Sequence, residues 1–140
     1  MIDGVKVEPA KQVDTFDVGQ NKNGFLTELF KDGKHTVVYL SAATPGAFKG
    51  YHYHQVRAAR YVCVKGKMKI IMYKNKVRQE VVLDASNPTR LFIPKQVATG
   101  LENIGDEEAW LINYPDPAYD PDLKDEQLEF TLEQLEQGEV

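Results

Sequence analysis

Short apolar or alternating runs, each bounded by turn residues, fill most of the chain. They recur about every ten residues and are rich in the β-branched and aromatic residues that favour strands. The predicted strands are residues 24–30, 35–41, 60–64, 67–73, 77–83, 89–93 and 109–113. Closely spaced strands without helical patterns between them are typical of a sandwich or barrel. The sequence therefore predicts an all-β fold.

One barrel domain, residues 1–121, accounts for the apolar pattern. At 140 residues and 42% hydrophobic, the chain is long enough for a single self-sufficient core. After Pro121 the composition changes, because residues 122–140 hold seven acidic residues against the single Lys124. Leucines at loosely helical spacing continue through this segment. We expect 122–140 to form either a short helix on the barrel or a frayed acidic tail.

Charge and cysteine content exclude several classes of function. The net charge of -4 provides no basic field for nucleic acid or an anionic membrane surface. Cys63 is the only cysteine, so neither an intramolecular disulfide nor a cysteine cluster for zinc can form. No run approaches the roughly 20 apolar residues that span a bilayer, and no leader pattern is found. We expect a cytoplasmic protein that binds a small molecule.

Two of the three histidines lie in one hexapeptide, residues 49–54. On a strand, His52 and His54 project to one face, and Tyr51 and Tyr53 to the other. A neutral imidazole with a pKa near 6.5 can act as a general base. Abstraction of a proton next to a ketone needs such a base, an acid on the opposite face and a group that stabilises the enolate.

The spacing around this pair matches the first metal-binding motif of cupin barrels. Gly46, His52, His54 and Gly66 keep the register, but Ala59 occupies the place of the glutamate ligand. Two imidazoles without that carboxylate fall short of the three or four ligands of a selective metal site. We therefore predict neither metal nor other cofactor.

A second cupin motif begins at Pro94 and ends at Asn103. Thr99 stands where the motif has its last histidine ligand, and Gln96 stands where it has glycine. Both matches favour the barrel and disfavour the metal. A metal site with ligands from elsewhere, for example Glu102 or an aspartate, is the third and least favoured hypothesis.

Four motifs occur in the order seen in the dTDP-4-dehydrorhamnose 3,5-epimerase family. They are Gly24-Phe25-x-x-Glu28, Lys49-Gly-Tyr-His52, Phe92-Ile-Pro94 with Ala98-Thr-Gly100, and Tyr119-Asp-Pro121. Residues 20–121 therefore resemble this family, in particular its short epimerase-related members. The resemblance implies a cupin jelly-roll barrel and a metal-independent epimerase or isomerase of a dTDP-4-keto-6-deoxyhexose, in deoxysugar or cell-surface polysaccharide biosynthesis.

The resemblance also implies roles for individual residues. His52 takes the place of the general base, Tyr119 that of the acid, and Lys49 that of an arginine that grips the diphosphate. Phe25 and Glu28 match the strand that meets the nucleotide, often across a dimer interface, so we expect a homodimer.

His54, Arg60 and Thr99 complete the predicted substrate-binding residues. Thr99 replaces the family's second active-site histidine, and the family's lysine falls at Ala59 or, with a slip of one residue, at Arg60. Arg57 and Arg60 could equally be solvated surface charges, although an arginine on the histidine face would suit a diphosphate.

The carboxylate that orients the base in full-length relatives comes from a segment that this chain lacks. A substitute could come from Asp120, Asp122 or Asp125. Without such a carboxylate, the alternative is a non-catalytic binder of nucleotide sugars or carbohydrates. A sugar 3,4-ketoisomerase is a further alternative, since it also passes through an enediol or enolate.

Overall fold

The computed structural model describes residues 3, 11–32, 36–115 and 120–140. These residues form eleven strands and one short helix. The elements are β1 (Gln12–Phe16), β2 (Lys22–Asp32), β3 (Thr36–Ala43), β4 (Phe48–His54), β5 (Ala59–Lys65), β6 (Lys67–Lys74), β7 (Val77–Asp84), β8 (Arg90–Ile93), β9 (Ala98–Asn103), β10 (Ala109–Asn113), β11 (Gln127–Glu129) and α1 (Leu132–Glu136).

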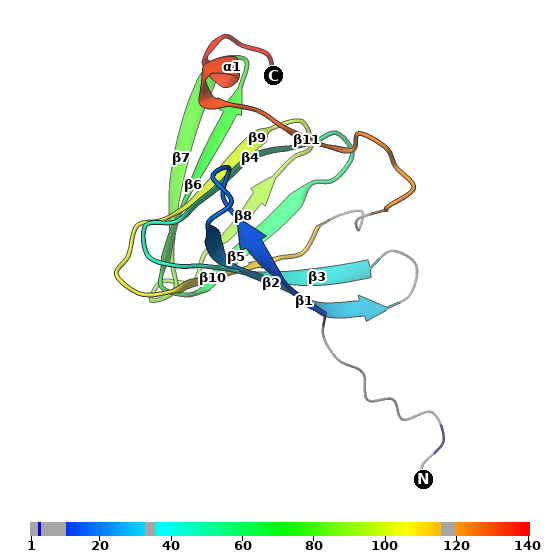
Figure 1. Ribbon diagram of the computed structural model, residues 1–140, viewed down its shortest axis with the longest axis vertical. Coiled ribbons are helices and arrows are strands. Elements are labelled where there is room, and N and C mark those ends of the chain that lie inside the picture. Colours follow the sequence, from blue (N-terminus) through cyan, green and yellow to red (C-terminus); the bar gives the residue numbers. More distant parts are fainter. Residues whose placement is uncertain (1–2, 4–10, 33–35, 116–119) are drawn as a thin grey trace.

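Two antiparallel sheets face each other (Figure 1). One has the order β1-β2-β3-β10-β5-β8, and the other the order β11-β4-β9-β6-β7. Each of the seven predicted strands corresponds to an observed one, so the all-β prediction is confirmed. β4 was considered as a strand only when the faces of the two histidines were assigned. The strands β1, β9 and β11 were not predicted, since short polar or glycine-containing segments such as Ala98–Asn103 carry little strand propensity of their own.

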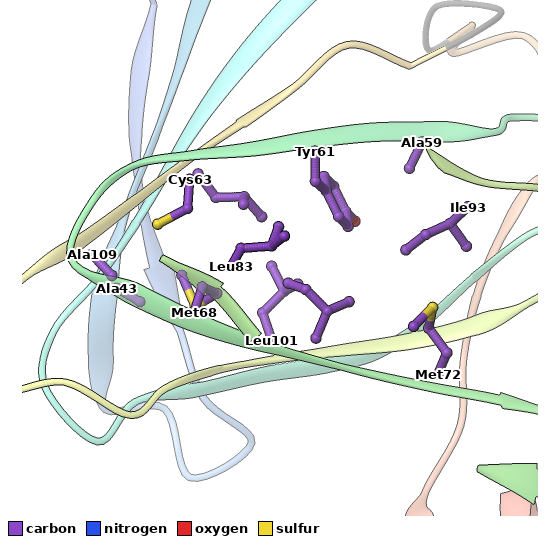
Figure 2. Packing of buried hydrophobic residues seen from close by; sticks show 12 residues of the cluster. Ala43, Ala59, Tyr61, Cys63, Met68, Met72, Leu83, Ile93, Leu101 and Ala109 are labelled. Atoms are coloured by element: carbon purple, nitrogen blue, oxygen red, sulfur yellow. The ribbon is translucent and has the colours of Figure 1, made fainter. Parts of the chain in front are cut away.

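The main core lies between the sheets (Figure 2). Along β5 the residues Ala59, Tyr61 and Cys63 point inward and are buried, as the period of two requires. From the facing sheet, Met68 and Ile70 of β6 are fully buried against them. The two sheets thus form one closed apolar layer, with the thiol of Cys63 inside it.

The acidic C-terminal segment is part of the fold. β11 pairs with β4, and α1 begins with a capping box between Thr131 and Gln134. Leu135 is fully buried in a second cluster on the outer face of the sheet, together with Tyr51 and Tyr73. Of the two forms predicted for residues 122–140, the structure shows the short helix on the barrel. In the described part of the chain, no helix is long and apolar enough to cross a membrane.

Replacement of Leu135 by alanine should lower the free energy of unfolding by about 2–4 kcal/mol, because it leaves a cavity under α1. The matched control is Leu132→Ala on the same helix, where the side chain is 45% exposed. Urea denaturation measures both. Equal losses in the two variants would contradict the packing described for α1.

Candidate active site

A cavity of about 1280 Å³ opens between the two sheets. Leu26, Tyr39 and Ser41 line it from the six-stranded sheet, and the turn at residues 16–20 closes part of its rim. The opposite wall comes from β4 and from β11, at the edge of the five-stranded sheet. This cavity holds both histidines of the hexapeptide.

On β4, the two histidines project to one face and the two tyrosines to the other, as predicted. His52 and His54 line the cavity, whereas Tyr51 and Tyr53 pack on the other face, under α1 and Phe130. Lys49 also lines the cavity, although strict alternation would place it on the side of Tyr51. A bulge between Lys49 and His52 accounts for this change of side.

Gly50 makes that bulge possible. Its φ is +137°, and a Cβ there would lie 2.8 Å from the carbonyl oxygen of Thr99 and 2.9 Å from the Cα of Gly100. A side chain would collide with the backbone of β9, so only glycine fits. Lys49 and His52, three positions apart, consequently face the same space.

Two side chains of β11 meet His52. Its Nδ1 lies 3.2 Å from Nε2 of Gln127 and 3.5 Å from Oε1 of Glu129. Burial lowers the pKa of His52, Glu129 acts in the opposite direction, and Lys49 lowers it further. The imidazole is therefore neutral at pH 7 and able to accept a proton.

Glu126 joins this edge of the barrel to the loop after β4. Its Oε1 lies 2.6 Å from Nε of Arg57, and its Oε2 accepts from the backbone N–H groups of Val56 and Arg57 at 3.1 and 3.3 Å. Burial alone would raise the pKa of Glu126. The hydrogen bonds from Val56 and Arg57 and the charge of Arg57 outweigh burial and lower this pKa to about 2.

Arg57 also connects His54 to β11. Its Nη2 lies 3.1 Å from Nδ1 of His54 and 3.2 Å from Oε1 of Gln127. Oε1 of Glu126 lies 3.3 Å from the same nitrogen of His54. Burial, and then the charge of Arg57, lower the pKa of His54, so this ring is also neutral at pH 7.

Lys49 is a buried cation of the cavity wall, as is Arg57. Its Nζ donates to the carbonyl oxygen of Ala42 at 2.7 Å and to Oγ of Ser41 at 3.1 Å. Only 9% of the residue is exposed, and burial lowers its pKa to about 8. Lys49 thus carries a positive charge at pH 7 that hydrogen bonds to neutral groups do not cancel.

The other predicted site residues lie in different places. Phe25 is half-buried on β2 opposite Ala42 and does not line the cavity, although its neighbour Leu26 does. Glu28 pairs with Tyr39 across β2 and β3, and its side chain is outside the described part. Tyr119 also lies outside the described residues.

The last two predicted site residues are Thr99, which lies beside β4, and Arg60, which lies away from the cavity. Thr99 is buried on β9 directly opposite His52, with its hydroxyl 3.5 Å from the carbonyl oxygen of Val97. Arg60 points away from the cavity, and its guanidinium carbon lies 5.8 Å from the ring centres of both Phe92 and Tyr114. Arg60 points outward because side chains alternate along a strand, and its neighbours Ala59 and Tyr61 face the core.

Three residues of the site were not predicted, namely Glu126, Gln127 and Glu129. Arg57 was considered only as a solvated surface charge or, on the histidine face, as an arginine that would suit a diphosphate. The carboxylates near the histidines come from these glutamates and not from the aspartates considered as substitutes, which precede β11. The alternation of Gln127 and Glu129 on a strand was a usable signal, but the leucine spacing indicated a helix instead.

The residues considered for a metal site do not gather. Within residues 11–32, 36–115 and 120–140, no three His, Cys, Asp or Glu side chains could hold an ion together. Glu102, the suggested extra ligand, is paired with Lys69 at 2.9 Å on the outer face of the five-stranded sheet. That placement removes Glu102 from the hypothesis.

Replacement of Glu126 by alanine should lower the free energy of unfolding at pH 7 by about 3–5 kcal/mol, because it removes a buried carboxylate that accepts from Nε of Arg57 and from two backbone N–H groups. The folded-state pKa of Glu126, about 2, is below the ordinary value of 4.5. Its stabilisation is therefore complete above pH 4.5 and disappears as the pH falls toward 2.

Urea titrations from pH 7 to pH 3 measure this loss, with the exposed Glu139→Ala as control. The difference in free energy of unfolding between wild type and Glu126→Ala should decrease as the pH falls. A difference that stays constant with pH would contradict the assigned ionisation of Glu126.

Comparison with known proteins places this chain in a family. Residues 19–127 match the family described as polysaccharide biosynthesis C-terminal domain. The spore coat polysaccharide biosynthesis protein SpsL of Bacillus subtilis is 29% identical over 138 residues, 90% of this chain and 87% of SpsL. The probable low-salt glycan biosynthesis epimerase Agl13 of Haloferax volcanii is 27% identical over 130 residues, 83% of each chain.

Solved structures share the fold. The capsular polysaccharide assembling protein CapF from Staphylococcus aureus superimposes with a TM-score of 0.71 at 22% identity, over 84% of this chain and 34% of CapF. The chain thus spans about a third of CapF. RmlC, a dTDP-6-deoxy-D-glucose-3,5-epimerase from Legionella pneumophila, superimposes with a TM-score of 0.63 at 18% identity, over 81% of this chain and 69% of RmlC.

The predicted cupin jelly-roll barrel is confirmed by these likenesses. The family match includes both cavity histidines and extends through Gln127 of β11. The chain therefore belongs to the polysaccharide biosynthesis C-terminal domain family, and it shares the fold of the 3,5-epimerase RmlC.

Proposed function

We propose that this chain is a metal-independent sugar epimerase acting on a nucleotide-linked 4-keto-6-deoxyhexose, with dTDP as the carrier, in cell-surface polysaccharide biosynthesis. The observation that carries the proposal is a neutral imidazole, His52, in a large cavity beside the buried cation Lys49. The relative Agl13 is named an epimerase, and the RmlC structure contains dTDP-4-keto-L-rhamnose. A cytoplasmic location remains the expectation from the sequence.

The chemistry needs one proton removed and one returned. His52 takes the proton from the carbon next to the ketone, and the electron pair of that C–H bond moves into the carbonyl to give an enolate. A proton delivered from the other face inverts the centre, and Tyr119 remains the predicted acid. Glu129 supports the base, since a carboxylate 3.5 Å from Nδ1 stabilises the imidazolium that forms.

Lys49 provides the charge for the diphosphate in this proposal. It is the buried cation nearest to His52 on β4, and its ammonium contacts only neutral acceptors in the described contacts. The charge of Arg57, in contrast, is balanced by Glu126. The cavity also has room for a nucleotide, since a volume near 1280 Å³ exceeds that of a typical drug-sized ligand site.

Replacement of His52 by asparagine should slow the exchange of the sugar C–H with deuterium oxide by about 10²–10⁴-fold, because the base is lost. Nuclear magnetic resonance of dTDP-4-keto-6-deoxyglucose incubated with enzyme measures this exchange. Arg90→Asn, at an exposed position of β8, is the matched control.

Absence of exchange with wild-type protein, together with a thermal shift on adding dTDP, would replace epimerisation by non-catalytic binding. A product with a moved ketone would assign the 3,4-ketoisomerase reaction instead. Elemental analysis of protein purified without chelator tests metal independence, and stoichiometric metal would refute it.

The affinity for dTDP should fall as the pH rises through 8. Lys49 has a folded-state pKa of about 8, so its ammonium is present below that pH and is lost above it. Lys49→Met should weaken binding about tenfold at pH 7, consistent with one charge-assisted hydrogen bond. Lys49→Met should also abolish the dependence of the dTDP affinity on pH.

Isothermal titration calorimetry at pH 6.5, 7.5 and 9 measures this binding. Lys69→Met, on the outer face, is the matched control. An unchanged pH profile in Lys49→Met would place the phosphates elsewhere.

A homodimer is part of the proposal. β1 lies at the edge of the six-stranded sheet, and its residues Val13 and Phe16 are 43% and 54% exposed. An edge strand with exposed apolar side chains favours pairing with a second chain. Sedimentation velocity should give about twice the chain mass of 15.9 kDa. A monomer at all micromolar concentrations would contradict it.

A further inference from the structure

His52 has two neighbours on β11 that require opposite positions of its hydrogen. The amide nitrogen of Gln127, 3.2 Å from Nδ1, can only donate, so it requires a lone pair on Nδ1. The carboxylate of Glu129, 3.5 Å from the same nitrogen, can only accept, so it requires a hydrogen there. The orientation of the Gln127 amide therefore determines which nitrogen of His52 carries the proton.

Arg57 determines that orientation. A guanidinium has donors only, and its Nη2 lies 3.2 Å from Oε1 of Gln127. If the amide were rotated by 180°, its NH₂ group would face the guanidinium, and two donors would meet. Oε1 therefore stays toward Arg57 and Nε2 toward His52. Arg57 is itself held at 2.6 Å by Glu126, and only 8% of it is exposed.

We propose that Gln127, oriented by Arg57, holds neutral His52 in the tautomer with its hydrogen on Nε2. The 3.2 Å contact from Gln127 lies at the upper end of the normal hydrogen-bond range, whereas the 3.5 Å contact of Glu129 lies beyond it. Gln127 is in this sense a positioning residue, since it acts through the imidazole.

The same guanidinium acts on His54. Nη2 of Arg57 lies 3.1 Å from Nδ1 of His54 and can only donate to it. Oε1 of Glu126, the competing acceptor, lies farther away, at 3.3 Å against 3.1 Å for Nη2 of Arg57. One buried cation thus sets the same tautomer in both rings, directly in His54 and through an amide in His52.

A consequence for catalysis follows, and it rests on the proposed function. A base needs a lone pair on the nitrogen that meets the substrate. Nε2 carries a hydrogen as long as Gln127 donates to Nδ1. His52 becomes a base through Nε2 once Nδ1 takes a proton from solvent and Nε2 releases its own to solvent, so that an Nδ1–H group faces Glu129 in place of the Gln127 donor. The charged and titratable neighbours of His52 are Lys49 and His54 on β4, which oppose a second proton, and Glu129 on β11, which favours it.

Nitrogen-15 correlation spectra of histidine-labelled protein near pH 8 test the tautomer directly, because both cavity rings are neutral there. Wild type should show His52 with its hydrogen on Nε2. Gln127→Leu removes the donor, and Gln127→Glu replaces it by an acceptor, so both should shift His52 toward the Nδ1–H form. Gln137→Leu on the C-terminal side of α1 is the matched control, and His54→Asn and His35→Asn assign the signals.

Wild type with the hydrogen on Nδ1, or a His52 tautomer unchanged in both Gln127 variants, would overturn the inference. The spectra need no substrate, so a lack of epimerase activity leaves their result intact. Where exchange activity is present, Gln127→Leu should raise the deuterium exchange rate several-fold and Glu129→Gln should lower it. The reverse order would refute the catalytic consequence.

Discussion

A buried carboxylate, Glu126, joins the last strand of the barrel to the loop that follows the two histidines. It accepts from two backbone N–H groups and from the guanidinium of Arg57. A lone charge at this depth would be strongly unfavourable, so each member of the pair requires the other. Because Glu126 immediately precedes β11, the pair also holds β11 against β4, and β11 brings Gln127 and Glu129 to His52.

The active-site wall depends equally on a local departure from regular strand geometry. In an undistorted β4, Lys49 would face α1, and the buried cation left at the cavity wall in the described residues would be Arg57, which is paired with Glu126. The bulge at Gly50 changes the side and places Lys49 with His52. Bulges commonly re-aim side chains next to functional sites. Glycine at position 50 therefore serves the chemistry through the backbone and has no side chain of its own to contribute.

The second sheet shows how one short segment can serve stability and function together. Its outer face is covered by Leu135 and Phe130, which follow β11 in the chain. Its inner face receives polar side chains from β11 itself. Strand alternation separates the two tasks, since Leu128 lies opposite Tyr53 while its neighbours lie opposite His54 and His52. The acidic composition of the segment reflects both the cavity contacts and the solvent-exposed face of α1.

The sequence by itself determined the strand content, the common face of His52 and His54, and the family motifs, because these depend on local period and spacing. Only the tertiary structure decided that Arg57 enters the cavity while Arg60 leaves it, that Lys49 joins the histidines, and that glutamates approach them. Each of these depends on a bulge, a loop or a pairing between positions some 70 residues apart, such as β11 with β4. Local patterns carry no record of such distant contacts, which form only when the sheets close.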